Sequence, residues 1–195
     1  MSKKISISVY CASSAKVNPV YLAAAEELGR IFLQENIHCI YGAGHIGLMG
    51  ILADTILKGK GEITGVIPEF MIEQDWHHKS LEKIIITQSM HERKARMAEM
   101  SDAAVALPGG CGTLEELLEI ITWKQLSLYQ KPIVIVNINN YFDPLIEMLQ
   151  KAIDEKFMRP EHEKLWVVVN NPKEVLNAIK NAPSSNQTGF NSAVV

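Results

Sequence analysis

The sequence lacks the features that mark disulfide-rich secreted proteins, membrane proteins and nucleic-acid-binding proteins. Its three cysteines are scattered singly with no Cys-x-x-Cys pair, which argues against a disulfide framework and a structural zinc site. No apolar run approaches the ~20 residues of a membrane-spanning helix. The net charge of −3 gives no basic excess of the kind that nucleic-acid binding needs. We therefore expect a cytoplasmic protein that has no metal, nucleic-acid partner or membrane attachment, and that holds any anionic ligand at a local site.

What the sequence contains, nearly end to end, is an alternation of apolar runs with segments of helical period. The expected strands cover residues 5–10, 38–41, 63–67, 83–87, 103–107, 133–138 and 165–169. The expected helices cover residues 19–34, 48–57, 90–100, 114–128, 144–157 and 173–179. Strands that are apolar on both faces and separated by helices indicate a doubly wound, Rossmann-like α/β fold, a parallel sheet with helices on both faces.

The length of 195 residues favours one domain, and we expect a single nucleotide-binding domain over residues 1–181. The Ser/Asn/Gln-rich stretch 182–195 is aperiodic, so we expect it to be a mobile tail. Residues 71–81 form the one long irregular connection, and such connections often carry function. In a doubly wound fold, ligands bind at the carboxyl ends of the strands.

The strongest local signal is a glycine-rich loop between the strand expected to end at residue 107 and the next helix. Residues 108–113 read Pro-Gly-Gly-Cys-Gly-Thr, and free backbone N–H groups beside a helix start form an anion site. Thr113 and Glu116 also have the spacing of a capping box, which would give Glu116 a structural role. Because a capping box needs no preceding glycines, the loop favours phosphate binding, with candidate ligands Gly109, Gly110, Cys111, Gly112 and Thr113.

Two other loops lie at expected strand ends and give weaker signals. The sequence Cys-Ala-Ser-Ser after the first strand offers hydroxyls such as that of Ser13, although this loop taken alone favours an ordinary turn. Residues 42–47 match the dinucleotide pattern G-x-G-x-x-G, but after the second strand instead of the first. The acidic residue expected about 20 positions on, Glu62, precedes its strand and is misplaced for a ribose. Gly44 and Gly47 stay candidate binding positions because glycine permits close backbone approach.

The helix expected over residues 90–100 carries an arginine on its apolar face. Helical spacing places Arg93 at the centre of the face that holds the methionines. Such an arginine usually lays its aliphatic stem along apolar surface with the charged head in water, or forms a buried ion pair. This helix, however, begins at the same sheet edge as the glycine loop, which favours a site arginine at least as strongly. Ser89 and Glu92 have the spacing of a helix cap, so Glu92 has a structural role of its own.

The helix expected over residues 114–128 is apolar on two faces. Leu117 and Ile121 belong to one face, and Ile120 and Trp123 to the other. One face would pack on the sheet and the other would meet a second copy of the chain, which predicts a homodimer with sites near the interface. The alternative is that a neighbouring helix of the same chain covers the second face.

Together these motifs resemble the Lonely Guy (LOG) family of cytokinin riboside 5′-monophosphate phosphoribohydrolases, proteins often labelled lysine decarboxylases. Residues 108–116 meet the family signature PGGxGTxxE, and residues 90–94 meet its Met-x-x-Arg-Lys segment. The resemblance covers about residues 5–180. It implies hydrolysis of the N-glycosidic bond of an adenosine 5′-monophosphate, often N6-prenylated, to the free base and ribose 5-phosphate without a cofactor. Matched by position, Arg93 and Glu116 are the catalytic pair, and the substrate-binding positions are Lys94, Gly110, Gly112, Thr113, Glu115 and Thr122.

The groups present fit that chemistry. Cleavage of a ribose–base bond passes through an oxocarbenium-like state, near which Glu116 would supply negative charge and orient water. The glycine loop would fix the 5′-phosphate, and Arg93 would hold ligand oxygens or keep Glu116 ionised. Alanines and a lysine at positions where many members have glycine, namely Ala12, Ala43 and Lys16, bear on substrate preference more than on reaction type.

Three rival functions stay open at this stage. A nucleotide or cofactor carrier without turnover would use the same fold, and a nicotinamide oxidoreductase would use residues 42–47. The decarboxylase label would need pyridoxal phosphate on a lysine, and no lysine stands in a pattern that singles it out. The sequence does not fix which purine base is preferred.

Overall fold

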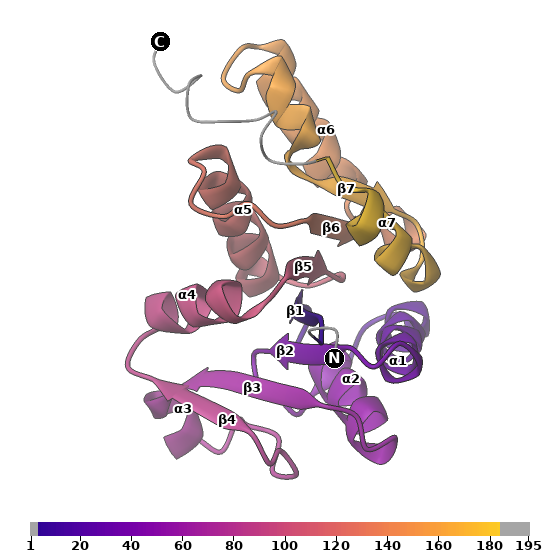
Figure 1. Ribbon diagram of the computed structural model, residues 1–195, viewed down its shortest axis with the longest axis vertical. Helices are drawn as coiled ribbons and strands as arrows, with labels where there is room; N and C mark the ends of the chain where they lie inside the picture. Colours follow the sequence, from indigo (N-terminus) through magenta and orange to yellow (C-terminus); the bar gives the residue numbers. More distant parts are fainter. Residues whose placement is uncertain (1–3, 184–195) are drawn as a thin grey trace.

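The computed structural model describes residues 4–183 and contains an all-parallel sheet of seven strands in the order β4-β3-β2-β1-β5-β6-β7 (Figure 1). The strands are β1 (Ser6–Tyr10), β2 (His38–Tyr41), β3 (Ile63–Pro68), β4 (Ile84–Thr87), β5 (Ala103–Ala106), β6 (Ile133–Val136) and β7 (Val167–Val169). The helices are α1 (Pro19–Gln34), α2 (Gly47–Lys58), α3 (Glu69–Glu73), α4 (Met90–Met100), α5 (Cys111–Gln125), α6 (Asp143–Asp154) and α7 (Val175–Asn181). Short 3₁₀ turns cover η1 (Ile138–Asn140), η2 (Pro160–Leu165) and η3 (Pro172–Glu174). The expected doubly wound, Rossmann-like fold is confirmed, while the expected tail lies outside the described residues from position 184 onward.

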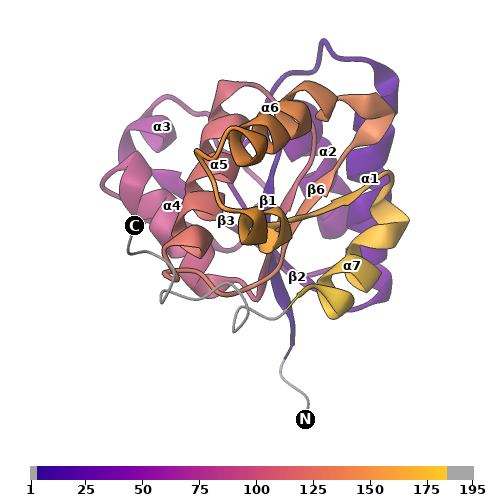
Figure 2. The same cartoon turned by 90° about the horizontal axis from the view of Figure 1, so that it is seen from above.

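Both faces of the sheet are covered, which explains why the strands read as continuous apolar runs. Alternate residues along β5 enter opposite layers: Ala103 and Val105 join one buried cluster, and Ala104 and Ala106 join the other. The first cluster packs under α1, α2 and α7, and the second under α4, α5 and α6 (Figure 2). Within residues 4–183, no helix combines the length and apolarity that crossing a membrane requires.

The strand order reverses between β1 and β5. From β1 the chain winds through β2 and β3 to β4, then crosses to β5 on the other side of β1 and continues to β7. The loops after β1 and β5 therefore diverge, and a crevice for ligands forms between them. Backbone hydrogen bonds hold the loops at this edge: Ala12 N–H donates to the Pro108 carbonyl and Met49 N–H to the Ala12 carbonyl, each over 3.2 Å.

Two segments differ from what the sequence pattern predicts. The connection expected to be irregular over residues 71–81 is entered through α3 (Glu69–Glu73), which follows β3 directly. Helix α5 starts at Cys111, three residues before the expected position, because residues 111–113 carry no apolar periodicity although they are helical. The same helix ends earlier than expected because Ser127, at a φ of 61°, cannot continue it.

Candidate functional site

A cavity of about 560 Å³ opens at the carboxyl edge of the sheet, within the size range of small-molecule sites. Its walls come from the loop after β1, the β2–α2 loop, the segment around α3, and the first turns of α4 and α5. Among the residues expected to act on substrate, those on the wall are Ser13, Gly44, Arg93, Gly110, Cys111, Gly112, Thr113 and Glu116. Residues on the wall that the sequence did not indicate as ligands are Cys11, Ala12, Gly42, His45, Ile46, Met49, Met71, Trp76 and Met90.

Helix α5 begins against this cavity with uncapped backbone N–H groups. Gly110 is its N-cap residue, and no side chain caps the helix. The first intrahelical bond runs from the Leu114 N–H to the Gly110 carbonyl over 3.0 Å, so the N–H groups of residues 111–113 have no intrahelical acceptor. The helix dipole adds partial positive charge at the same place. This wall is therefore suited to an anion such as a phosphate.

The capping box that the sequence predicts for Thr113 and Glu116 is wrong. The helix begins at Cys111, so Thr113 is already inside the first turn and Glu116 lies in the second. The Glu116 carboxylate contacts Arg93 on α4, and does not cap the start of its own helix. Its role must therefore be sought in the cavity.

The three glycines of the loop differ in whether the fold itself requires them. A Cβ atom on Gly109 would overlap the Thr113 hydroxyl and come within 3.0 Å of the Ala12 backbone nitrogen, so packing demands glycine there. A Cβ atom on Gly110 or Gly112 would meet no atom within 4 Å, and neither residue has a positive φ. Since the fold does not require glycine at these two positions, the space beside them is available to a ligand.

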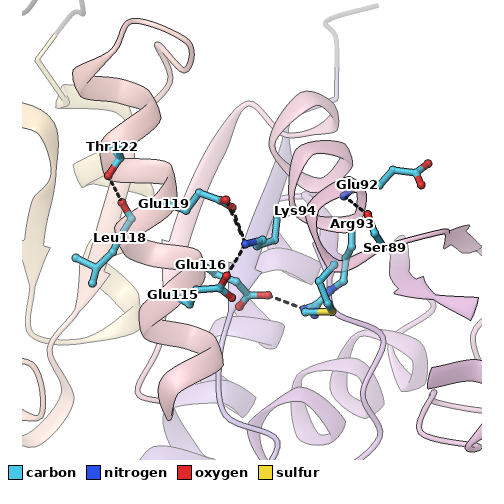
Figure 3. A network of polar contacts seen from close by, with 10 residues as sticks. Ser89, Glu92, Arg93, Lys94, Glu115, Glu116, Leu118, Glu119 and Thr122 are labelled. Carbon is cyan, nitrogen blue, oxygen red and sulfur yellow. Dashed lines mark hydrogen bonds and ion pairs between the residues drawn. The ribbon is translucent and has the colours of Figure 1, made fainter. Parts of the chain in front are cut away.

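Arg93 and Glu116 form a buried ion pair between α4 and α5 (Figure 3). Arg93 Nη2 donates to Glu116 Oε1 over 2.6 Å, and the two side chains are 6% and 4% exposed. The expected cap places Arg93 in the first turn of α4, because the Ser89 hydroxyl accepts from the Glu92 N–H over 3.1 Å. A buried ion pair adds little stability relative to well-packed apolar side chains, so this pair favours a chemical role.

The Arg93 guanidinium keeps donors that the described residues do not use. A guanidinium has five N–H donors. Besides the bond to Glu116, Nη1 lies 3.6 Å from Met90 Sδ, and the buried Nε has no hydrogen-bond partner among the described residues. The guanidinium packs closely against Gly42, because a Cβ atom on that residue would overlap Nη2. Unpaired buried donors are costly, so their presence beside a cavity indicates a site for ligand oxygens.

The environment of Glu116 shifts its titration. Burial raises the pKa of the Glu116 carboxyl, the Arg93 guanidinium opposes this rise, and the nearby Glu115 and Glu119 carboxylates add to it. A carboxylate with a raised pKa is suited to accept a proton near neutral pH. Burial also raises the pKa of the neighbouring Cys11 thiol, which keeps that group protonated and unsuited to act as a nucleophile.

Lys94 and Glu115, both expected to bind substrate, do not line the cavity. Lys94 Nζ donates to Glu115 over 2.6 Å and to Glu119 over 3.1 Å (Figure 3). Burial disfavours the charged ammonium, but these two hydrogen bonds outweigh it and raise the pKa of Lys94. The three residues thus connect α4 to α5 and set part of the field at Glu116.

Three other expected ligands also lie off the cavity wall. Gly109 packs against Thr113, and Gly47, at a φ of 65°, lies so close to the backbone of Ser14 that no side chain fits. The Thr122 hydroxyl donates to the Leu118 carbonyl over 2.8 Å on the exposed side of α5. In the described structure these residues shape or flank the site without facing its cavity.

A doubly wound sheet with an uncapped helix start at its switch point defines an α/β protein of the Rossmann type. The particular family follows from comparison with known proteins. Residues 49–179 match the family described as "Possible lysine decarboxylase", and the chain belongs to this lysine decarboxylase-like, or LOG, family. The family resemblance drawn from residues 90–94 and 108–116 is therefore confirmed.

Curated relatives match along most of the chain. It is 38% identical over 174 residues to the Oryza sativa subsp. japonica protein named probable cytokinin riboside 5′-monophosphate phosphoribohydrolase LOGL2, covering 89% of this chain and 71% of the relative. It is also 38% identical over 174 residues to the Arabidopsis thaliana cytokinin riboside 5′-monophosphate phosphoribohydrolase LOG7, covering 89% and 80%. Among solved structures, the Moco carrier protein of Chlamydomonas reinhardtii superposes with a TM-score of 0.68 at 22% identity, covering 92% of this chain and 98% of that one. The similarity to the Moco carrier protein shows that the two chains share a fold.

Proposed function

We propose that this protein hydrolyses the N-glycosidic bond of a purine nucleoside 5′-monophosphate to give the free base and ribose 5-phosphate. The observation that carries the proposal is the open space beside Gly110 and Gly112, which shares one cavity with the Arg93–Glu116 pair. A phosphate position and a buried carboxylate thus lie within reach of one small molecule. Relatives that are 38% identical are named as phosphoribohydrolases, which supports the same reaction.

In the proposed mechanism, the N–H groups at the start of α5 bind the 5′-phosphate and fix the ribose against Glu116. The bond between ribose C1′ and the base nitrogen breaks with its electron pair passing to the base. The Glu116 carboxylate stabilises the positive charge that develops on the ribose ring and takes one proton from the attacking water. The water oxygen forms the new bond to C1′, and the proton passes to the departing base. Arg93 keeps Glu116 ionised in spite of its burial and offers its unused donors to ligand oxygens.

We propose an adenine base, either plain or with an apolar N6 substituent. Besides the ion pair, the cavity wall includes the apolar side chains of Ile46, Met49 and Met71. Such a wall accepts a planar base and leaves room for methylene and methyl groups. The cytokinin riboside monophosphates named for the relatives carry that kind of base.

We also propose that the active form is a cytoplasmic homodimer. Leu118, Leu126 and Leu128 are exposed at the outer side and the end of α5, Leu128 by 72%. The sequence predicts that the face with Ile120 and Trp123 meets the second copy. That prediction is partly wrong, because Ile120 is buried in the core of its own chain. Exposed leucines in this number favour contact with a second copy. Three free cysteines, two of them buried, fit a reducing compartment.

The Glu116→Gln variant tests the reaction. We expect it to bind AMP as the wild type does and to lose about 10²- to 10⁴-fold in kcat, because the amide keeps the shape of the side chain but cannot hold charge or a proton. Binding is measured by calorimetry and turnover by chromatography of released adenine. Glu99→Gln, an exposed carboxylate on α4, is the matched control and should keep full activity. Wild-type turnover in Glu116→Gln would remove the carboxylate from the mechanism.

The carrier alternative is favoured by one observation, the close superposition with Moco carrier proteins. A carrier would bind nucleotide without releasing base, so the adenine-release assay separates the two functions. The decarboxylase label finds less support. Among the described residues, no lysine lines the cavity, and Lys124, whose pKa burial lowers to about 8, lies elsewhere. An absorbance band at about 420 nm in the purified protein would support that function.

A further inference from the structure

Residues 74–78, here called the strap, follow α3 and are fixed against the β2–α2 loop. Gly44 and His77 form an isolated antiparallel bridge. The His78 N–H donates to the Ala43 carbonyl over 2.8 Å, and His78 Nε2 lies 3.3 Å from Asp54 Oδ1 on α2. The strap is therefore held to the body of the protein from both its backbone and a side chain.

Trp76 lies in this strap with its backbone bonded on both sides. Its N–H donates to the Met71 carbonyl over 3.1 Å, and its carbonyl accepts from His45 Nδ1 over 3.0 Å. The residue nevertheless remains 51% exposed and forms part of the cavity wall. A large aromatic ring that the fold positions but leaves half uncovered is a preformed surface for a flat ligand.

We propose that the Trp76 indole stacks on the base of the bound nucleotide and so selects ligands that carry a base over ribose 5-phosphate alone. The inference rests on the proposed function, because it takes the phosphate position at the start of α5 as given. It adds a specificity-determining residue to the Arg93–Glu116 pair.

The order of the strands supports this placement. The phosphate loop follows β5, and the strap follows α3 after β3, with β1 and β2 lying between them in the sheet. With neighbouring strands about 4.8 Å apart, the two ends of the cavity are separated by roughly 14 Å. That span suits a phosphate, a sugar and a base laid end to end. Besides Trp76, the cavity wall includes the apolar side chains of Ile46, Met49 and Met71, so a neutral aromatic base fits it better than a charged group.

The test compares AMP with ribose 5-phosphate, which has the phosphate and sugar but no base. Both ligands are titrated by calorimetry into Glu116→Gln protein, in which hydrolysis does not consume AMP. Adding Trp76→Ala should weaken AMP binding about tenfold, which equals about 1.4 kcal/mol, and leave the affinity for ribose 5-phosphate unchanged. Trp76→Phe should restore most of the AMP affinity, because its smaller ring still stacks.

Phe70→Ala is the matched control, because Phe70 is an exposed aromatic on α3 that does not line the cavity. It should bind both ligands as the parent does. Unchanged AMP affinity in Trp76→Ala, or an equal loss for AMP and ribose 5-phosphate, would overturn the stacking inference alone. If the parent protein bound neither ligand, the proposed function would fail together with it, so the two failures are distinguishable.

Discussion

The two glycine-rich loops at the ligand edge look alike in sequence and differ in what they do. The β2–α2 loop and the β5–α5 loop each join a strand to a helix at the same edge of the sheet. At the first, Cβ atoms on Gly44 in the loop and on Gly47 and Gly50 at the start of α2 would collide with Met49 Sδ, the Ser14 backbone and the His45 backbone, respectively. In the second, Gly110 and Gly112 have open space where a side chain would lie. One loop thus uses glycine for close packing and the other leaves room for a ligand.

This difference explains why the match to G-x-G-x-x-G in residues 42–47 misleads. Those glycines let the loop pack against the loop after β1 and against α2, and Gly42 leaves room for the Arg93 guanidinium. Because close packing explains these glycines, the pattern is no evidence for a dinucleotide site. The nicotinamide alternative therefore loses its main support, and absence of NADH fluorescence quenching by the protein is the expected result.

The largest effect that this comparison predicts is on substrate affinity. Gly112→Ala should raise the KM for AMP and lower kcat/KM by about 100-fold in total, because its methyl group enters the phosphate space and displaces the ribose. Stability should stay level or rise by up to about 1 kcal/mol, since alanine favours a helix over glycine. Steady-state kinetics and urea unfolding on the same preparation check both halves. Loss of stability with normal kinetics would mean that Gly112 serves the fold.

The opposite result is expected in the other loop. Gly47→Ala should lower the free energy of unfolding by about 1–3 kcal/mol, because its φ of 65° is unfavourable for alanine and its methyl group would collide with the Ser14 backbone. The variant that still folds should keep a KM within a fewfold of the wild type. A variant as stable as the wild type but unable to bind AMP would place Gly47 among the ligand contacts. The two glycine-rich loops would then not differ in function.

The smallest predicted effect is a shift in pH dependence. Activity requires ionised Glu116, whose pKa is raised by burial, so kcat/KM should fall with decreasing pH at a midpoint above the ordinary glutamate value of about 4.3. Glu115→Gln removes a negative charge that raises this pKa, so its midpoint should move to lower pH. Lys94→Gln removes a positive charge and should move it to higher pH. Shifts in the reversed directions, or none, would show that another group controls the acid limb.

The sequence predicts the sheet and both helical layers, because each depends on local periodicity. Arg93 and Glu116 are 23 positions apart, and only the family resemblance of the two segments that hold them brings them together. It misplaces the start of α5, since Cys111 to Thr113 form helix without any apolar signal. It misses Trp76 in the cavity because the strap is placed by contacts with residues about 30 positions away, such as the bond from His78 N–H to the Ala43 carbonyl. It also cannot show that Lys94 bonds to Glu115 and Glu119 instead of lining the cavity, because that depends on how α4 meets α5.

The most direct test of the account is the product analysis of wild-type protein supplied with AMP and, separately, with adenosine. We expect adenine and ribose 5-phosphate in equal amounts from AMP, and turnover of adenosine at least about 100-fold slower, because the phosphate supplies the binding energy that positions the ribose. Other purine and pyrimidine 5′-monophosphates, including N6-prenylated AMP, run beside them to rank the bases. Adenosine turned over as fast as AMP, or no adenine from any monophosphate, would contradict the role assigned to the loop at Gly110 and Gly112.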